Sequence, residues 1–220
     1  MIVGVSQGSG WALTETNSIG TAIGGPDFLS RPLSCGRALP LADIRVIDIA
    51  SGNVLLEPNM EGELCIRTIC KMNGYWKNDD AEEIDSDGWI RSGDVGKIDE
   101  DGFVYITDRL KDLVIRGGEN ISCASVEDCI YRSYPSGILE TCVFGLPHTR
   151  YGEQLCAVVC TREVNSVSEQ HIREFLEKHL PVFQVPSKIW IREFRGAPLP
   201  RGGTGKLLKR ELRREYLDKI

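Results

Sequence analysis

Up to residue 108, hydrophobic and polar residues alternate in short, strand-like runs. After residue 108, such runs are interspersed with segments whose hydrophobic residues recur at helical spacing. The runs "IRVID" (44–48), "GELCIRT" (62–68) and "GFVYITD" (102–108) lie between Gly, Asn, Asp or Pro residues and predict β-strands. Between the last two runs lies an acidic stretch, residues 79–101, with ten Asp or Glu. Charge runs of this kind are typical of solvated loops, so we interpret most of this stretch as a loop.

The second half of the chain alternates predicted strands with predicted helices. "SEQHIREFLEKHL" (168–180) carries apolar residues at helical spacing, with Ser168 as a candidate N-cap. Further helices are expected in "SVEDCIYRSY" (125–134), opening at Ser125, and in "GKLLKRELRREYL" (205–217), and further strands in "DLVIRGG" (112–118), "ETCVFGLP" (140–147), "EQLCAVVCT" (153–161) and "KIWIREF" (188–194).

These elements predict the α+β class with a boundary near Asp108–Arg109. Residues 1–108 are expected to be mostly β, and residues 109–220 to combine a central sheet with flanking helices. A domain of about 110 residues is large enough to bury its own core.

Composition narrows the class of protein. The chain has 220 residues, of which 41% are hydrophobic and 26% charged, and its net charge of −6 argues against a dedicated nucleic-acid binder. No apolar run approaches the roughly 20 residues of a membrane span, and the first residues do not resemble a secretory signal. Five of the eight cysteines lie in apolar strand-like runs and no Cys or His spacing fits a zinc site, so we expect reduced thiols and a cytoplasmic protein.

Four glycine-containing stretches carry candidate chemistry. In "GWALTET" (10–16), Trp11 precedes Thr14 and Glu15. An aromatic face can stack on a base, a hydroxyl can contact a phosphate, and a carboxylate can bind Mg²⁺. An ordinary loop around a buried tryptophan explains the same residues.

The second stretch runs from "GWIRSGD" to "RLKD". It places Asp94 directly after Gly93 at the end of a strand-like run, where a carboxylate could accept hydrogen bonds from the two hydroxyl groups of a ribose. Arg109 follows a predicted strand, where its guanidinium could bind a sugar or phosphate oxygen. Turn aspartates and a surface arginine explain this spacing equally well.

The third stretch, "RGGENISC" (116–123), contains Gly117 and Gly118. Paired glycines fit a tight hairpin or a loop whose backbone a ligand approaches closely, and a plain hairpin is the simpler interpretation.

The fourth stretch, "PRGGTGK" (200–206), ends at Lys206. It is not the phosphate-binding loop G-x-x-x-x-G-K-[ST], because Leu207 follows the lysine and Pro200 stands where the first glycine is required. A mobile lysine could instead neutralise negative charge that develops on phosphate oxygens. The basic residues behind it alternate with acidic ones at helical spacing, which predicts a solvated, self-paired helix rather than a nucleic-acid contact.

In this order the stretches resemble the C-terminal portion of the ATP-dependent adenylate-forming enzymes, which include acyl-CoA synthetases, luciferases and peptide-synthetase adenylation domains. "GWALTET" is similar to the family's Y-G-x-T-E segment, and "GELCIRTICKMNGYWKN" to its G-E-[LI]…G-Y segment. "GWIRSGDVGKIDEDGFVYITDRLKDLVIRGGENI" is similar to the G-D…D-x-x-G…R-x-K-D…G-G-E-x-I signature, and "PLPRGGTGKLLKREL" to the closing P-R-T-x-x-G-K segment. The resemblance covers nearly the whole chain and is strongest to ligases of medium- or long-chain fatty acids.

The resemblance implies a fold and a reaction. Residues 1–108 would be the end of a large AMP-binding domain, including part of a distorted β-barrel, and residues 109–220 a mobile C-terminal domain. A carboxylate would attack the α-phosphate of ATP to give an acyl-adenylate and pyrophosphate. The thiol of coenzyme A would then displace AMP.

Residue roles follow from the same resemblance. Lys206 would bridge the carboxylate and the α-phosphate in the first step, and Lys111 would mark the hinge of the mobile domain. The remaining roles are adenine stacking by Trp11, a phosphate contact by Thr14, Mg²⁺ binding by Glu15, ribose binding by Asp94 and Arg109, and a path for the pantetheine arm along Gly117, Gly118 and Glu119.

The chain also departs from the family pattern. Trp11-Ala12 replaces Tyr-Gly, Cys123 and Ser125 replace proline and glutamate, and Gly202 replaces threonine. Nothing resembles the family's Ser/Thr/Gly-rich phosphate loop, and most of the acyl pocket is absent. We therefore expect a partner in the missing N-terminal part of the large domain, and an inactive chain without it. A carrier-loading adenylation domain and a non-catalytic binding fragment remain open alternatives.

Overall fold

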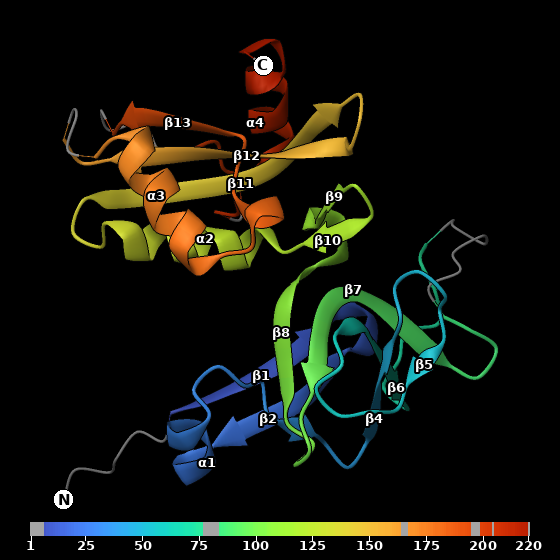
Figure 1. Ribbon diagram of the computed structural model, residues 1–220. Helices are drawn as coiled ribbons and strands as arrows, with labels where there is room; N and C mark the ends of the chain where they lie inside the picture. Colours follow the sequence, from blue (N-terminus) through green and yellow to red (C-terminus); the bar gives the residue numbers. More distant parts are fainter. Residues whose placement is uncertain (1–6, 77–83, 164–166, 195–198, 204, 220) are drawn as a thin grey trace, which may run out of the picture. The chain divides into compact units, whose positions relative to one another are not determined.

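A computed structural model describes residues 7–76, 84–163, 167–194, 199–203 and 205–219. The chain divides into two compact units, Met1–Lys111 (unit 1) and Asp112–Ile220 (unit 2). Figure 1 labels their helices and strands. Both units contain sheets and helical segments, so the expected α+β class is confirmed.

Unit 1 contains two antiparallel sheets, with strand orders β1-β2-β3 and β5-β4-β6-β7-β8. The sheets do not close into a barrel within the described residues. The strands are β1 (Gly8–Leu13), β2 (Ser18–Gly24), β3 (Arg37–Ala38), β4 (Ala42–Ile47), β5 (Val54–Leu55), β6 (Gly62–Thr68), β7 (Trp89–Ile98) and β8 (Val104–Arg109), and the helical segments are η1 (Thr14–Thr16) and α1 (Gly25–Ser30). A further helical turn, η2 (Leu110–Asp112), contains the boundary between the two units.

The core of unit 1 joins its two sheets. Trp11 of β1 packs in one cluster with Val46 of β4, Leu64 and Ile66 of β6, and Ile90 of β7. Burial of a large apolar side chain contributes about 1.5–3 kcal/mol, so this cluster fixes β1 against the larger sheet. The segment that follows β1 is thereby held next to β6 and β7.

The acidic stretch contains a strand that the sequence revealed only in part. β7 occupies Trp89–Ile98, and its Ile90 and Val95 are buried, so the strand-like run in "GWIRSGD" is part of a strand that continues to Ile98, where a loop was expected. The reason is that Arg91 and Asp94 form ion pairs with other strands of unit 1 instead of facing water alone. Residues 79–83 of the stretch lie outside the described residues.

Unit 2 has one five-stranded sheet. β12 pairs with β11 antiparallel along its length, with β13 parallel, and with β9 at a single antiparallel position. The strands are β9 (Val114–Arg116), β10 (Glu119–Ile121), β11 (Ile138–His148), β12 (Gly152–Thr161) and β13 (Lys188–Glu193), and the helical segments are α2 (Cys123–Ser133), α3 (Glu169–His179), η3 (Val182–Gln184), α4 (Lys209–Tyr216) and η4 (Leu217–Lys219).

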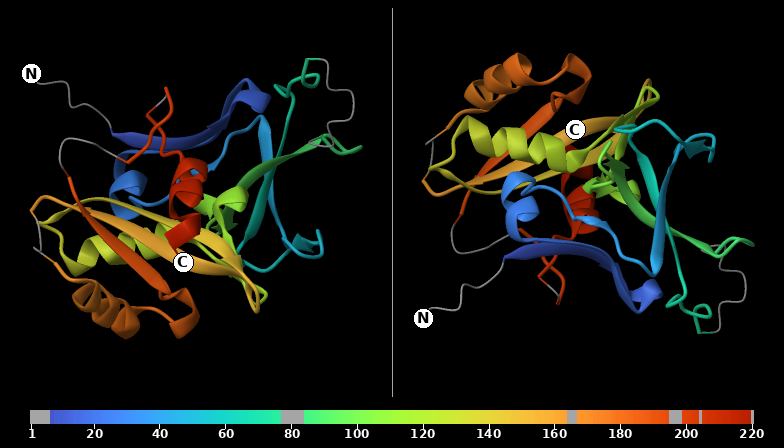
Figure 2. Two further views of the ribbon diagram at one scale, coloured as in Figure 1. Left: turned by 90° about the horizontal axis from the view of Figure 1, so that it is seen from above. Right: turned by 90° about the horizontal axis from the view of Figure 1, so that it is seen from below.

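The two faces of this sheet carry different helices, as Figures 1 and 2 show. Because strand residues alternate between faces, Leu155 and Ala157 pack with α2 and α3, whereas Cys156 and Val158 pack with α4. The near-continuous apolar run of β12 reflects a strand that is buried on both faces.

The helix boundaries show where local sequence signals were sufficient. Ser168 caps α3 as predicted, because its Oγ accepts a hydrogen bond from His171 N at 3.1 Å. α2 instead begins at Cys123, with Ser122 as its cap, so the predicted opening at Ser125 was wrong. α4 begins at Lys209, four residues after the predicted start.

The cysteines agree with the expectation of reduced thiols. All eight lie in the described part of the chain, and none of them forms a disulfide. Six are buried, whereas Cys35 and Cys70 are partly exposed. Cys70 lies in a turn after β6 and not in a strand, as its apolar run had suggested.

Candidate functional site

Glu15 lies in the short turn η1, directly after β1, whose Trp11 is buried. Its Oε1 accepts a hydrogen bond from the Tyr75 hydroxyl at 2.6 Å, and its backbone oxygen accepts one from Met72 N at 2.7 Å. The Tyr75 hydrogen bond is the main cause that lowers the pKa of Glu15, and the charge of Arg109 acts in the same direction. Glu15 is therefore an ionised, partly exposed carboxylate at neutral pH.

Thr14, the first residue of η1, is exposed. Its carbonyl accepts a hydrogen bond from Asn17 N, and the Asn17 side chain donates to Cys70 O at 3.0 Å. These contacts hold Thr14 and Glu15 in a turn that is fixed to the segment after β6.

Asp94 and Arg109 are brought together on the neighbouring strands β7 and β8. They are direct partners in the β7–β8 register, and Arg109 Nε lies 2.6 Å from Asp94 Oδ1. The Asp94 side chain is 4% exposed, whereas that of Arg109 is 48% exposed. A buried carboxylate thus holds a guanidinium that still reaches solvent.

Trp11 supports the same carboxylate from β1. Its indole Nε1 donates to Asp94 Oδ2 at 2.8 Å, and the residue is 4% exposed. A ring covered to this extent offers a base no open face, so adenine stacking does not fit this arrangement. The alternative of a buried tryptophan is the one that the geometry favours, and the indole N–H serves Asp94.

A β-bulge directs the Asp94 side chain toward Trp11 and Arg109. The β6–β7 register shifts between Glu63 and Cys65, at the residues Ser92–Asp94, and Gly93 has a φ of +68°, a left-handed conformation that favours glycine. Ser92 Oγ donates to Leu64 O and accepts from Asp94 N. The bulge re-directs the chain at Asp94.

Glu63 holds this bulge from β6. The residue is 2% exposed, and its Oε1 accepts from Gly93 N at 3.2 Å. Its Oε2 accepts from Arg91 Nε at 2.9 Å and from Arg91 Nη2 at 2.5 Å. Sequence reasoning gave no role to Glu63 or to Tyr75, although both stand in the quoted G-E…G-Y segment.

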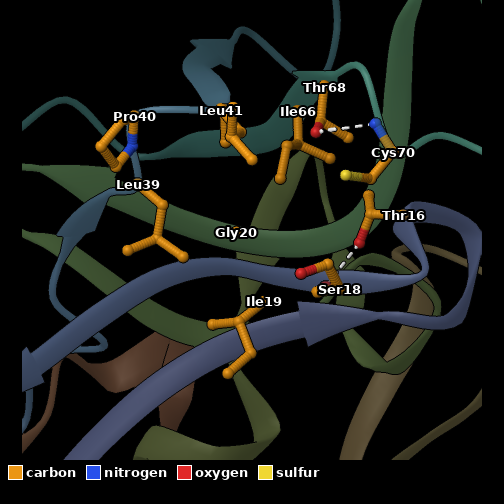
Figure 3. Close-up of a pocket in the computed structure, with 11 residues that line it drawn as sticks. Thr16, Ser18, Ile19, Gly20, Leu39, Pro40, Leu41, Ile66, Thr68 and Cys70 are labelled. Carbon is orange, nitrogen blue, oxygen red and sulfur yellow. Dashed lines mark hydrogen bonds between the residues drawn. The ribbon is translucent and has the colours of Figure 1, made fainter.

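A pocket of about 260 Å³ opens beside η1 in unit 1 (Figure 3). Its lining is mostly apolar. It comes from η1, from β2, from the start of β4 and the residues before it, from β6, and from the turn after β6. It contains no Asp, Glu, Lys, Arg or His side chain. Glu15, Asp94 and Arg109 do not line the pocket, which is suited to apolar groups. The residues that line it are Thr16, Ser18, Ile19, Gly20, Leu39, Pro40, Leu41, Ala42, Ile66, Thr68 and Cys70.

Lys111 is exposed and is the last residue of unit 1. Gly117 and Gly118, at the start of unit 2, form the turn between the paired strands β9 and β10, with φ values of +62° and +93°. The hairpin expected from the paired glycines is present, and Gly117 N donates to Tyr151 O at 2.9 Å. Glu119, the first residue of β10, is exposed.

Lys206 lies in unit 2 and is exposed. It directly follows Gly205 in a hairpin closed by a bridge between Arg201 and Leu207. The Lys206 carbonyl accepts a backbone hydrogen bond, whereas the sequence suggested that a mobile loop carries this lysine. Thr204 lies outside the described residues. The basic helix behind it is only partly self-paired, because Lys209 pairs with Glu127 of α2.

The structure thus gathers the predicted residues into two groups. Trp11, Glu15, Asp94 and Arg109 interact within unit 1, while Lys206 and the Gly117–Gly118 hairpin belong to unit 2. Within the described residues no three His, Cys, Asp or Glu side chains are arranged to hold a metal ion. None of the described helices combines the length and apolar character that crossing a membrane requires.

Comparison with known proteins identifies the same two parts of the chain. Residues 3–76 match the AMP-binding enzyme family, and residues 125–206 match the AMP-binding enzyme C-terminal domain. The long-chain-fatty-acid–CoA ligase FadD13 of Mycobacterium tuberculosis is 37% identical over 208 residues, which are 94% of this chain and 39% of that protein. The mitochondrial medium-chain acyl-CoA ligase ACSF2 of Rattus norvegicus is 36% identical over 83% of this chain and 29% of its own length.

A solved structure is also similar. ATP-bound MatB from Rhodopseudomonas palustris superimposes with a TM-score of 0.84 at 32% identity, covering 96% of this chain and 41% of that one. The chain therefore spans less than half the length of the relatives that it matches.

Proposed function

The chain belongs to the AMP-binding enzyme family, and we propose that it is part of an ATP-dependent carboxylate–CoA ligase. The observation that carries the proposal is the group formed by Glu15, Asp94 and Arg109. It combines the ionised carboxylate of Glu15 with an ion pair in which Asp94 is buried and Arg109 is half exposed. Such a group can bind a metal-bound polyphosphate and a sugar diol side by side.

In the first step, a carboxylate oxygen attacks the α-phosphorus of ATP. The bond between the α-phosphorus and the bridging oxygen breaks, and pyrophosphate leaves with the electron pair. Asp94, whose side chain is 4% exposed, orients Arg109 toward the ribose through the 2.6 Å contact between Arg109 Nε and Asp94 Oδ1. Arg109 donates to a ribose oxygen, and Thr14 donates to a phosphate.

Glu15 provides one oxygen ligand for Mg²⁺. A single carboxylate fits this ion, because Mg²⁺ commonly takes one or two protein carboxylates and completes its shell with water and substrate phosphates. The lowered pKa of Glu15 keeps the ligand ionised. When bound, the ion supplies positive charge to the phosphate oxygens.

Lys206 is the cation that stabilises the charge developing between the attacking carboxylate and the α-phosphate. Its exposed side chain, at the end of a hairpin, is suited to reach a site formed elsewhere. In the second step, the coenzyme A sulfur attacks the acyl carbon, AMP leaves, and the thiol proton passes to solvent. The Gly117–Gly118–Glu119 turn lines the path of the pantetheine arm.

The alternation of these two steps requires a hinge, which we place at Lys111. The division of the chain between Lys111 and Asp112 supports this position. It also supports two functional domains, one from the large domain and one mobile, with the boundary three residues after the predicted one between 108 and 109. Movement of a domain about a hinge can exchange the Lys206 hairpin for the Gly117–Gly118 turn during the cycle.

The proposed substrate is a medium- or long-chain fatty acid. Support comes from the two ligases described above, which are named for long-chain and medium-chain substrates. The absence of disulfides among eight cysteines supports a cytoplasmic location. The chain alone is expected to be inactive, because the portion of its relatives that it does not match is needed to complete the site.

The test is carboxylate-dependent ATP–pyrophosphate exchange in the whole protein that contains this chain. We expect exchange with medium- and long-chain fatty acids, and Lys206→Ala to lower its rate by about 10²–10³-fold. Lys188→Ala, at an exposed lysine of the same unit, is the matched control and should stay within twofold. Exchange that is absent with every carboxylate, or that Lys206→Ala leaves unchanged, contradicts the proposal.

The acceptor is tested separately. Release of AMP with free coenzyme A, accompanied by a fatty acyl thioester, supports the ligase. Transfer only to a carrier-protein thiol would identify an adenylation domain instead.

A further inference from the structure

The hairpin that carries Lys206 is closed by backbone hydrogen bonds. Gly202 N donates to Lys206 O and Gly205 N to Gly202 O, each at 2.9 Å, and Leu208 N donates to Pro200 O at 2.8 Å. These bonds fix the shape of the hairpin, but they do not connect it to the rest of unit 2.

The side chain of Arg201 makes one such connection. Arg201 Nη1 donates to Gly205 O at 2.8 Å, on the peptide that leads directly into Lys206. Its Nη2 lies 2.6 Å from Glu140 Oε1 on β11. A single planar guanidinium therefore joins the central sheet to the residue before the lysine. The ammonium group of a lysine at this position could not make both contacts with the same geometry, because it is a compact point charge and not a planar fork of donors.

Glu140 is placed to anchor this contact firmly. Its second oxygen, Oε2, accepts from Leu199 N at 2.8 Å, and Leu199 is 1% exposed in the cluster between the sheet and α4. The Glu140 side chain is 16% exposed, which shields its ion pair with Arg201 more than a surface pair would be. Both oxygens of one carboxylate on a rigid strand thus hold the start of the hairpin.

The far end of the hairpin is anchored as well. Lys209, the first residue of α4, lies 3.3 Å from Glu127 of α2. Between the two anchors, the side chain of Lys206 extends into solvent. The backbone that carries the lysine is ordered in advance, and only its side chain has to be ordered when a nucleotide binds.

We propose that Arg201 and Glu140 are positioning residues for Lys206 in the adenylation step. This inference rests on the proposed function, in which Lys206 contacts the α-phosphate. Arg201 and Glu140 act through the hairpin and do not contact the substrates. Misplacement of a catalytic group by about 1 Å can cost roughly 10²-fold in rate, so a lost anchor should be visible in kinetics.

The experiment compares the two half-reactions in the whole protein. Arg201→Ala and Glu140→Gln should each lower ATP–pyrophosphate exchange by about 10–10²-fold, mainly in kcat. Thioester formation from preformed fatty acyl-adenylate and coenzyme A should stay within twofold, because Lys206 is not used in that step. Arg201→Lys should restore only part of the exchange rate.

A double-mutant cycle and a matched arginine complete the design. The double variant Arg201→Ala/Glu140→Gln should be no slower than the slower single variant, since both remove one anchor. Arg192→Ala is the control: Arg192 has a side chain of similar exposure, 33% against 38%, and an ion pair with Glu215 at 4.0 Å. It should change exchange by less than twofold.

The outcomes separate the inference from the function on which it rests. If Lys206→Ala abolishes exchange and Arg201→Ala leaves it within twofold, the inference fails and the function stands. Equal losses in both half-reactions for Arg201→Ala indicate a structural role and also overturn the inference. If Lys206→Ala itself leaves exchange unchanged, the proposed function fails.

A second measurement uses this chain alone and does not depend on activity. Backbone ¹⁵N order parameters of Gly202 and Gly205 should be near about 0.85 in the parent chain and fall toward about 0.6 in Glu140→Gln. Unchanged order parameters in a folded Glu140→Gln variant would refute the anchoring argument.

Discussion

Arg109 Nε lies 2.6 Å from Asp94 Oδ1, and the same two residues are paired across the β7–β8 ladder. The backbone register and the ion pair therefore both place Arg109 beside Asp94. Asp94 is buried, and the indole N–H of Trp11, which belongs to a different sheet, donates a hydrogen bond to its second oxygen. The carboxylate consequently links β1, β7 and β8 as well as forming part of the proposed ribose site.

Replacement of Asp94 should affect both stability and binding. Asp94→Ala leaves Trp11 Nε1 without this acceptor and removes the partner of Arg109, so we expect a loss of about 1–3 kcal/mol in the free energy of unfolding. Urea denaturation followed by tryptophan fluorescence measures it. Asp43→Ala, in the exposed pair of Asp43 with Arg67, should cost less than about 1 kcal/mol. Equal effects of the two substitutions would contradict the buried role of Asp94.

Tyr75 should control the titration of Glu15. The Tyr75 hydroxyl lowers the pKa of Glu15 below its ordinary value of 4.5, so Tyr75→Phe should raise that pKa. Because the folded pKa is the lower one, the interaction stabilises the fold above pH 4.5 and its contribution is lost as the pH falls through the folded value. Carboxyl ¹³C NMR titrations of the two proteins make the comparison. An unchanged Glu15 titration in Tyr75→Phe would show that the hydroxyl is not the cause.

Glu63 should be required for the bulge that presents Asp94. Glu63→Ala leaves Gly93 N and Arg91 without their acceptor inside unit 1, and loss of one partner of a buried pair costs about 3–5 kcal/mol. We expect a value at or below the lower end, because half of the Arg91 side chain is exposed. Glu63→Gln keeps an acceptor oxygen and should be milder. Thermal unfolding of the three proteins tests the order, and a Glu63→Ala variant as stable as the parent would exclude this role.

Local sequence signals predicted the parts of the fold that depend on neighbouring residues. The α3 helix was found because Ser168 and the apolar spacing that follows it are local signals. β7 was found only in part because its charges are compensated by residues far away in the sequence: Glu63 is 28 residues from Arg91. Ser122 and Ser125 are both acceptable caps, and only the fold selects Ser122.

The candidate site was predictable to the same extent. The motifs pointed to Glu15, Asp94 and Arg109, which the structure brings together. They could not indicate that Tyr75, 60 residues away, donates to Glu15, since nothing in the local pattern couples the two segments. They also could not distinguish a stacking indole from a buried one, because burial of Trp11 depends on β4, β6 and β7.

The Gly117 turn should tolerate only residues that accept a left-handed backbone. Gly117 has a φ of +62°, and an added Cβ would lie 3.6 Å from Tyr151 Cδ1, an ordinary contact. The cost of Gly117→Ala is therefore conformational, about 1–2 kcal/mol, and Gly117→Asn should cost less. Denaturation followed by the fluorescence of Trp190, the only tryptophan in unit 2, measures both. If alanine and asparagine cost the same, the argument from backbone conformation is wrong.

The buried thiols of unit 2 should be unreactive in the folded chain. Burial raises the pKa of Cys142 to about 12, and those of Cys156 and Cys160 to about 11. Because the thiolate is the reactive form, iodoacetamide at pH 8 should modify the partly exposed Cys70 first and these three only after unfolding. Mass spectrometry of timed digests identifies the modified residues.

The same pKa values determine how stability changes in alkali. A thiol with a raised folded pKa favours the folded state fully below its unfolded pKa of 9, and this contribution is lost as the pH rises toward 11 or 12. Unfolding midpoints of unit 2 should therefore fall above pH 9, and Cys142→Ala should reduce the slope of that fall, although its smaller side chain lowers stability at every pH. Rapid labelling of Cys142 in the folded chain, or an identical slope in Cys142→Ala, would show that this thiol is not held protonated by the core between the sheet and α4.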